Sequence, residues 1–305
     1  MLKNFSPHSL GINGRQSELI ELALTYGFRG MDVDMADMLR RSQRSSIDEA
    51  AKYLRATDLL VGGFELSETN LDADDEAFAT QVASLHPLAE LAQQLGATRA
   101  YIQLPVATDR LPYHEYFEIQ KTRLSQIAEV LSGKDIRLGV GFRAGKELEE
   151  GKEFPFVRNV EGLRALVSSV SGAGIYLDTW DWVVGDGAMD QLSELTAADI
   201  VAVRLGSLPA DVDITVATSS DRVLPEKEGT LNHVSVVKHL STIGFDGPLS
   251  PSASPTQYKG QTRESTVQKS QQAVDGISKD AGLHVATLPM DMIEDIPYEA
   301  TTTPV

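Results

Sequence analysis

The chain has 305 residues, a formal net charge of −17 and 42% hydrophobic residues, enough for one large core. It lacks both an apolar run of about 18 residues and an apolar segment near its N-terminus, so we expect a cytoplasmic protein without a membrane span. The absence of cysteine excludes thiol nucleophiles, disulfides and cysteine-ligated zinc. The acidic balance, without a concentrated basic face, argues against nucleic-acid binding.

Short apolar segments alternate with amphipathic helical segments along the chain. The predicted strands are 10–12, 30–34, 59–66, 100–104, 136–142, 175–177, 200–205 and 248–250. The predicted helices are 17–26, 46–57, 87–95, 121–131, 160–167, 190–195, 234–243 and 264–281, and residues 67–80 are expected to form a loop. Eight strand–helix units predict a closed (β/α)8 TIM barrel of the α/β class. We expect one barrel domain over residues 1–283 and a C-terminal tail over 284–305.

The sixth predicted strand ends in an unusual group of acidic and aromatic residues. Asp178 and Asp181 lie three residues apart, and both tryptophans of the chain, Trp180 and Trp182, stand beside them. Because catalytic residues of TIM barrels follow the C-terminal ends of strands, we interpret the two aspartates as candidate catalytic acids. An indole can stack on a sugar or pack under a loop, and we expect one tryptophan to do each.

Other strand ends carry polar residues that are candidates for ligand binding: Glu65, Gln103 and Arg143. For Glu65 and Gln103 the alternative is a hydrogen bond inside the barrel, and for Arg143 it is a solvated side chain. Of the six histidines, none follows the predicted strands five to eight, and His8 is expected to precede the first strand. Histidine ligands for a metal are therefore missing from the expected site.

Four segments, 136–142, 177–182, 199–204 and 243–252, resemble the xylose-isomerase-like TIM barrels. This family contains sugar phosphate isomerases and epimerases, and endonuclease IV is a relative. The resemblance covers about residues 8–283 and implies the barrel fold, an isomerase or epimerase role in carbohydrate metabolism, and one divalent cation at the barrel mouth. In such enzymes the cation polarises a carbonyl or an enediolate, and acidic groups move the proton.

Most of the metal ligands that the resemblance implies are replaced in this chain. The glutamate that closes the fifth strand is Gly141, whereas the aspartate of the sixth strand is present as Asp178. The histidine three residues later is Asp181, the histidine of the seventh strand is Arg204, and the glutamate of the eighth strand is Ser252. An arginine offers no lone pair to a metal and repels it, so the pattern indicates a degenerate metal site.

We expect Arg204 to take the place of the metal and to bridge Asp178 and Asp181 through its planar guanidinium. The favoured hypothesis is a barrel that binds a small sugar-like or acidic ligand at its mouth, with Ser252 among the ligand contacts and without a metal cofactor, whether or not it is catalytic. One alternative is an active sugar isomerase or epimerase that uses Mn, Zn or Mg in a rearranged site. Another is a metal-free acid–base enzyme that uses the two aspartates and Arg204. The sequence leaves open whether the chain is a monomer or a homodimer.

Overall fold

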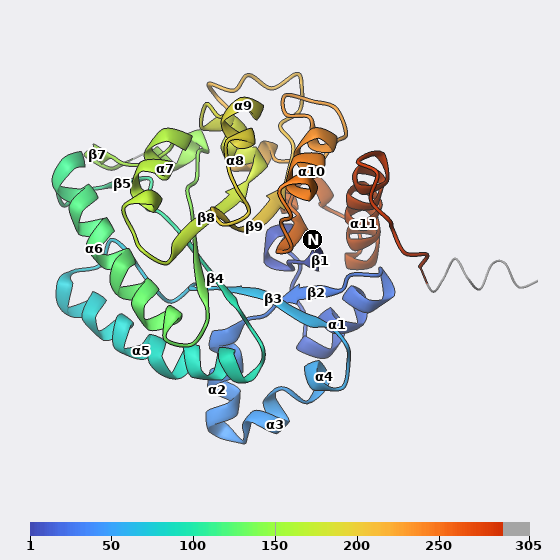
Figure 1. The fold of residues 1–305 in the computed structure, drawn as a ribbon, viewed down its shortest axis with the longest axis horizontal. Helices are drawn as coiled ribbons and strands as arrows, with labels where there is room; N and C mark the ends of the chain where they lie inside the picture. The colour runs from blue at the N-terminus through green and yellow to red at the C-terminus, as the bar shows by residue number, and fades with distance from the viewer. Residues whose placement is uncertain (150, 289–305) are drawn as a thin grey trace, which may run out of the picture.

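A computed structural model describes residues 1–149 and 151–288 and contains a closed barrel of eight parallel strands (Figure 1). Around the barrel the strands follow the order β1-β10-β9-β8-β6-β4-β3-β2. Their bounds are β1 Leu2–Phe5, β2 Gly30–Asp32, β3 Leu60–Glu65, β4 Arg99–Gln103, β6 Arg137–Gly141, β8 Ala173–Asp178, β9 Ile200–Leu205 and β10 Pro248–Pro251. The predicted (β/α)8 barrel is confirmed.

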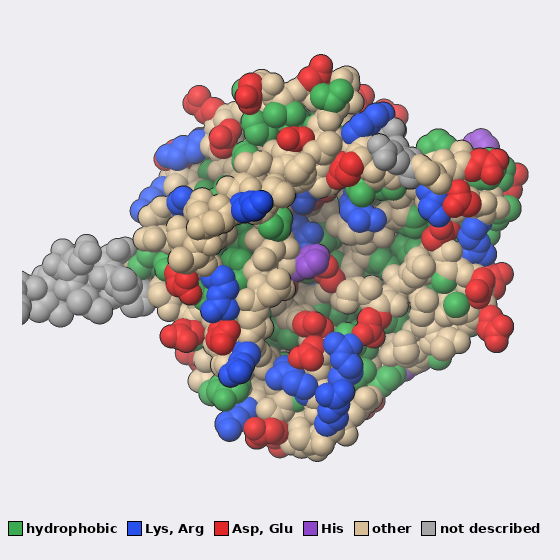
Figure 2. Space-filling model, turned by 180° about the vertical axis from the view of Figure 1, so that it is seen from behind, with side chains coloured by type: hydrophobic (Ala, Val, Ile, Leu, Met, Phe, Trp, Pro, Cys, Tyr) green, Lys and Arg blue, Asp and Glu red, His purple; other side chains and the backbone are tan. Residues whose placement is uncertain are grey.

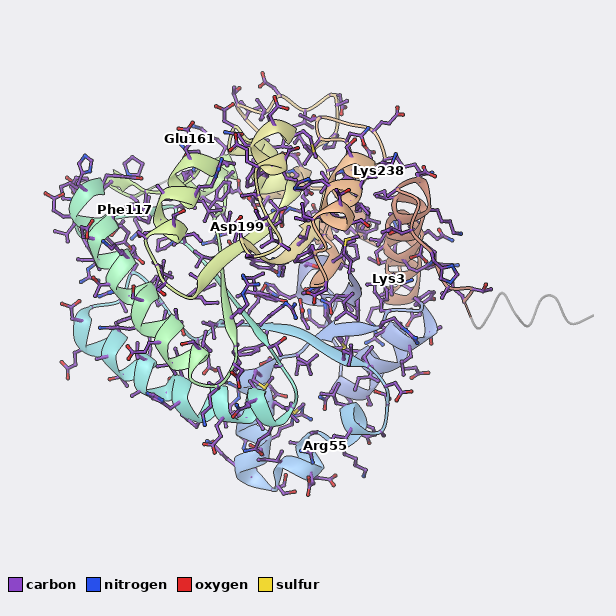
Figure 3. The ribbon with its side chains drawn as sticks, viewed as in Figure 1. Lys3, Arg55, Phe117, Glu161, Asp199 and Lys238 are labelled. Carbon is purple, nitrogen blue, oxygen red and sulfur yellow. The ribbon has the colours of Figure 1, made fainter. Side chains whose placement is uncertain are left out.

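Helices surround the barrel and cover its apolar outer face (Figure 1). They are α1 Gln16–Thr25, α2 Met35–Arg44, α3 Ile47–Ala50, α4 Lys52–Arg55, α5 Asp75–Gln94, α6 Tyr113–Ser132, α7 Val160–Ser168, α8 Thr179–Val184, α9 Met189–Ser193, α10 His233–Thr242 and α11 Arg263–Asp280. Charged residues such as Glu161 of α7 and Lys238 of α10 lie on the outside of this ring (Figure 3). Within the described residues, no helix is both long and apolar enough to cross a lipid bilayer.

The first barrel strand lies eight residues earlier than the sequence pattern indicated. The predicted strand 10–12 is wrong: β1 is Leu2–Phe5, and the short 3-10 helix η1, His8–Leu10, follows it. Gly11 has φ of 64°, a left-handed conformation that suits glycine and ends η1. His8 therefore follows the first strand and lies at the mouth of the barrel.

Several helix boundaries also differ from the prediction. Residues 67–80 are not all loop, since α5 starts at Asp75, where Asp74 caps it by accepting a hydrogen bond from the backbone N–H of Ala77. The helix then continues through Pro87, which the sequence suggested as its first residue. The helix predicted from residue 121 begins at Tyr113. The helices α2 and α8 were not predicted, nor was the small antiparallel sheet of β5, Ala107–Thr108, with β7, Phe154–Pro155.

The interior of the barrel carries aromatic and polar side chains that support the mouth. Tyr101 and Tyr176 stack with ring centroids 4.3 Å apart. Space for Tyr101 comes from Gly63, since a Cβ at that position would lie 2.1 Å from the tyrosine hydroxyl oxygen. Asn4 donates from Nδ2 to Asp32 Oδ1 at 2.8 Å and to Ser250 Oγ at 2.9 Å. These contacts tie three strands together directly below the mouth.

The predicted C-terminal tail falls partly outside the described residues. After α11, residues 283–288 form neither helix nor strand and help to line a cavity at the opposite end of the barrel from the mouth, beside Lys3 and Phe28. Residues 289–305 lie outside the described part of the chain. The boundary between barrel and tail at residue 283 therefore stays a prediction.

Candidate functional site

A cavity of about 520 Å3 opens at the C-terminal ends of the barrel strands. Its walls include the strand-end residues Glu65, Gln103 and Arg204 and the loop residues Arg143 and Arg222. Figure 2 shows a hollow on one face of the molecule, in which basic, acidic and histidine side chains come together. The sequence-predicted residues Glu65, Gln103, Arg143, Asp181 and Arg204 all line this cavity.

The two aspartates at the end of β8 are buried and fixed by the start of α8. Asp178 caps this helix, because its Oδ1 accepts hydrogen bonds from the backbone N–H groups of Trp180 and Asp181 at 3.0 and 3.3 Å. Asp181 Oδ1 accepts from the backbone N–H of Ala144 at 2.8 Å. Only 5% of Asp178 and 4% of Asp181 is exposed. Two carboxylates this deeply buried require a nearby cation or a proton.

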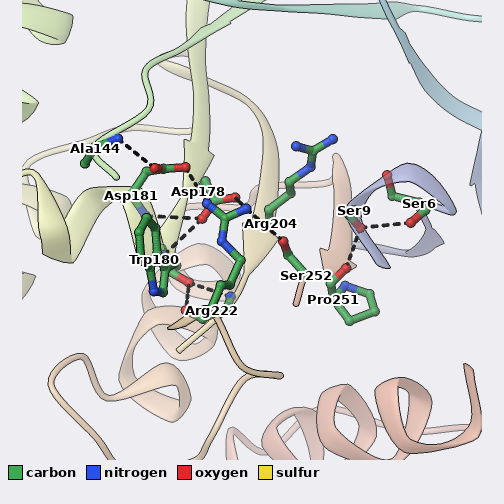
Figure 4. Close-up of polar contacts among 12 residues, drawn as sticks. Ser6, Ser9, Ala144, Asp178, Trp180, Asp181, Arg204, Arg222, Pro251 and Ser252 are labelled. Atoms are coloured by element: carbon green, nitrogen blue, oxygen red, sulfur yellow. Dashed lines mark hydrogen bonds and ion pairs between the residues drawn. The ribbon is translucent and has the colours of Figure 1, made fainter. Parts of the chain in front are cut away.

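The cation is Arg222, which the sequence analysis did not identify. Its Nη2 lies 2.6 Å from Asp181 Oδ2, and its Nη1 lies 3.3 Å from Asp178 Oδ2. Figure 4 shows its guanidinium between the two aspartates and Ser252. The guanidinium also lies over the ring of Trp180, at 4.9 Å from the centroid. Arg222 therefore bridges the aspartate pair.

The backbone of Arg222 is held by the loop that follows β9. Ser207 and Val223 exchange two backbone hydrogen bonds of 3.0 Å across this loop, and the N–H of Ser254 donates to the Arg222 carbonyl oxygen at 2.8 Å. Arg222 is the only arginine between Arg204 and Arg263. This isolation among the arginines in the last third of the chain could have identified Arg222 as a candidate. No local sequence pattern predicts which aspartates its side chain contacts.

The electrostatics of this cluster follow from its burial. Burial raises the pKa of Asp181 to about 6, and the nearby Asp178 adds to the effect, while Arg222 opposes it. Burial disfavours the charge on Arg222, but the two aspartates outweigh it and raise the pKa of Arg222. The guanidinium therefore stays charged, and Asp181 takes up a proton on mild acidification.

Arg204 does not bridge the aspartates, and that prediction is wrong. Although Arg204 is paired in register with Asp178 on the neighbouring strand, its Nη2 donates to Glu65 Oε1 on β3. Its guanidinium lies 4.7 Å from the ring centroid of Tyr176 and points away from both aspartates (Figure 4). Arg204 has a side chain long enough to reach across the barrel, so strand register alone did not fix its partner.

The floor of the cavity contains buried polar atoms that lack partners. Gln103 lies across Gly141, where a Cβ would come within 2.7 Å of Gln103 Oε1. Among the described residues, Gln103 Oε1, Tyr176 Oη and Arg204 Nε are buried without a hydrogen-bond partner. An unpaired buried polar atom is costly, so these atoms are available to form hydrogen bonds with a polar group that enters the cavity.

Three predicted ligand contacts lie behind the cavity wall. Trp180 and Trp182 are both fully buried, and neither lines the cavity, so the expectation that one of them stacks on a ligand is not supported. Trp182 instead donates from Nε1 to the carbonyl oxygen of Ala188 at 3.1 Å. Ser252 is also fully buried and accepts a 3.4 Å hydrogen bond from Arg222 at its Oγ. These side chains support Arg222 and the loops around it.

The charges that line the cavity leave one arginine unmatched. Arg204 is paired with Glu65 and Arg222 with Asp181. Arg143 is exposed on the same wall, and its side chain makes no ion pair or hydrogen bond to another residue in the described part of the chain. An unmatched guanidinium beside hydroxyl groups favours an anionic ligand group.

No group of three or more His, Cys, Asp or Glu side chains is arranged to hold a metal ion among residues 1–149 and 151–288. The two aspartates illustrate why: of their four carboxylate oxygens, two accept backbone hydrogen bonds and two face Arg222. A metal at this place would have to displace a buried guanidinium from both carboxylates.

Comparisons with known proteins agree with this fold. A family model described as xylose isomerase-like TIM barrel matches residues 20–275. A xylose isomerase domain protein from Alicyclobacillus acidocaldarius subsp. acidocaldarius is 20% identical, with a TM-score of 0.81 over 92% of this chain and 99% of that chain. The structure of the IOLI protein with a binding zinc atom is 18% identical, with a TM-score of 0.75 over 92% and 99%.

A D-psicose 3-epimerase with D-tagatose from Clostridium cellulolyticum H10 is 12% identical, with a TM-score of 0.69 over 92% of this chain and 99% of that chain. At these identities the structural similarity shows the fold alone. No curated protein matches the chain significantly.

Proposed function

Because the chain belongs to the xylose isomerase-like TIM barrel family, we propose that its mouth binds a small sugar acid or similar polyhydroxylated anion, and that it does so without a metal. The observation that carries the proposal is the placement of Arg222 between Asp178 and Asp181. The guanidinium supplies the positive charge that these carboxylates need, so a divalent cation does not fit there.

The lining of the cavity supports the chemical class of the ligand. Arg143 provides an unmatched positive charge for a carboxylate or phosphate, and Ser219, Ser220 and Ser254 provide hydroxyl groups close by. The unpaired polar atoms of Gln103 and Tyr176 supply hydrogen bonds to sugar hydroxyls at the floor. A ligand with an anionic end and several hydroxyl groups would pair with Arg143 and also form hydrogen bonds with Gln103 and Tyr176.

The alternatives receive less support. A metal-dependent isomerase with a rearranged site would require Asp178 and Asp181 to exchange Arg222 for the ion. A metal-free enzyme that uses these aspartates as bases would require them to leave the same arginine and their backbone donors. A cytoplasmic location and the choice between monomer and homodimer stay predictions.

Metal content tests the first half of the proposal. Protein purified without chelator is expected to contain less than about 0.1 equivalents of Mn, Zn or Mg by elemental analysis. The reason is that the electrostatic repulsion between the buried guanidinium of Arg222 and a cation about 4–5 Å away amounts to several kcal/mol. Addition of each ion should leave the unfolding temperature unchanged within error. One equivalent of tightly bound metal that EDTA removes with a loss of stability would contradict the proposal.

Ligand binding tests the second half. With EDTA present, calorimetry is expected to detect binding of D-gluconate and D-glucuronate, two six-carbon sugar acids. Arg143→Ala should weaken both by about 10–100-fold, the usual effect of losing a charge-assisted hydrogen bond. Arg164→Ala provides a matched control, since Arg164 pairs with Glu194 on the outer surface, and it should bind like the wild type. Failure of both acids to bind would refute the proposed ligand class.

A further inference from the structure

The correction of the first strand places a histidine at the mouth that the sequence pattern assigned elsewhere. His8 begins η1, three residues after β1 ends, and its imidazole is largely exposed. It lines the cavity of about 520 Å3 and also a second cavity of about 480 Å3. The two cavities share His8, Glu65 and Ser67. A ligand that extends from one into the other must therefore pass the histidine.

His8 faces the carboxylate that also holds Arg204. Its Nε2 lies 3.6 Å from Glu65 Oε2, while Glu65 Oε1 accepts from Arg204 Nη2. One carboxylate thus connects an imidazole that can move a proton with a guanidinium that can bind an oxyanion. A distance of 3.6 Å is longer than a hydrogen bond, but such contacts in ligand-free enzymes often tighten when the substrate binds.

The other titratable groups near the cavity are less suited to proton transfer. Asp178 and Asp181 are both engaged by Arg222 and by backbone N–H groups. Asp32 accepts from Asn4 in the barrel interior and lines only the second cavity. His8, by contrast, has its Nδ1 free of any hydrogen-bond partner among the described residues and stands in contact with solvent. It is therefore the group best placed to take a proton from a ligand.

Unpaired polar atoms near this group point independently to a ligand. Tyr176 Oη, in a residue that is 3% exposed, and Arg204 Nε, in a residue that is 7% exposed, are buried without hydrogen-bond partners in the described part of the chain. Both residues line the cavity beside Glu65. They offer donors at the place where negative charge would develop on a bound carbonyl oxygen.

We infer that His8, Glu65 and Arg204 form a metal-free acid–base site that isomerises or epimerises a sugar acid at the carbon next to its carbonyl group. This inference rests on the proposed function, because it requires the ligand to lie in the same cavity.

The proposed step balances without a co-reactant. His8 Nδ1 takes the proton from the carbon next to the carbonyl, and the electrons of that C–H bond form the carbon–carbon double bond of an enediolate. The carbonyl π electrons move to oxygen, where Arg204 binds the negative charge. Glu65 stabilises the imidazolium through Nε2–H. Return of the proton to the former carbonyl carbon gives isomerisation, provided that the hydroxyl proton of the neighbouring carbon passes through solvent to the former carbonyl oxygen as the new carbonyl forms. Return of the proton, carried by solvent, to the opposite face of the original carbon re-forms the first carbonyl and gives epimerisation.

The test follows exchange of carbon-bound hydrogen by proton NMR in D2O with EDTA, with D-glucuronate as the probe. The wild type is expected to replace the hydrogen at C2 with deuterium. His8→Gln should slow this exchange at least 100-fold while changing the binding constant less than threefold, and Glu65→Gln should slow it at least 10-fold. His114→Gln, which alters an exposed histidine of α6, should exchange like the wild type.

D-gluconate gives a matched ligand control, because it keeps the carboxylate and hydroxyl groups but has no aldehyde. It should bind without exchange. Binding of D-glucuronate without exchange, or exchange that His8→Gln leaves unchanged or that EDTA abolishes, would overturn the acid–base site. Absence of binding would overturn the proposed function along with it.

Discussion

Arg222→Ala is expected to lower the free energy of unfolding by about 3–5 kcal/mol at pH 7.5, the usual cost of leaving a buried charge without its partner. Asp178 and Asp181 would then share a buried place without a cation. At pH 5 the loss of unfolding free energy should be clearly smaller, because burial raises the pKa of Asp181 to about 6 and this carboxylate can take up a proton there. Denaturant unfolding at the two pH values measures both quantities.

Two further variants separate charge from packing. Arg222→Met keeps an aliphatic stem against Trp180. The loss of unfolding free energy that this variant still shows therefore reflects the missing charge. Arg263→Ala removes an arginine from a half-exposed pair with Glu18 and should cost less than about 1 kcal/mol. If Arg222→Ala lost the same stability at pH 5 and pH 7.5, the guanidinium would be a packing element and the arginine-for-metal proposal would fail.

Asp32→Asn is expected to gain stability relative to the wild type by about 2 kcal/mol as the pH rises from 4 to 7.5. Burial raises the pKa of Asp32 from 3.8 to about 6, although Asn4 donates a hydrogen bond to it. In this range the unfolded chain has already released the proton that the folded chain still holds, so the stability of the wild type falls as the pH rises. The asparagine variant has no proton to lose.

The measurement is the difference in unfolding free energy between variant and wild type at several pH values. Asp199→Asn offers a control of opposite sign, since hydrogen bonds from the side chain and backbone of Thr196 lower the pKa of Asp199. That variant should lose stability relative to the wild type as the pH rises through the ordinary range of an aspartate. If the difference in unfolding free energy between Asp32→Asn and the wild type did not vary with pH, the Asp32 carboxyl of the wild type would have an ordinary pKa.

The placement of the two arginines changes the interpretation of the site. Arg222 compensates the aspartates from a loop, which leaves Arg204 available to Glu65 and to the cavity. Arg222 therefore compensates buried charge at the rim, and Arg204 faces the cavity beside Glu65. The proposal that an arginine stands in place of a metal keeps its physical reason, but it now concerns Arg222 instead of Arg204.

The sequence by itself determined the barrel and the strand ends that surround its mouth. Apolar segments alternating with helical ones are a local signal, and they located seven of the eight strands within a few residues. Glu65, Gln103, Asp181 and Arg204 were assigned to the mouth because parallel strands bring their C-terminal ends to one side. The first strand was missed because residues 10–12 are more apolar than residues 2–5, which include Lys3 and Asn4. Only the closure of the barrel between β10 and β2 identifies residues 2–5 as the strand.

Only the tertiary structure decided which charged groups meet. Arg222 reaches the aspartates from 41 residues away in the sequence, and Arg204 crosses the barrel to a glutamate 139 residues away. Such pairs depend on loop paths and on side-chain lengths, which leave no periodic pattern in the sequence. The same holds for His8 and Glu65, because their approach at the mouth requires that the barrel first be closed.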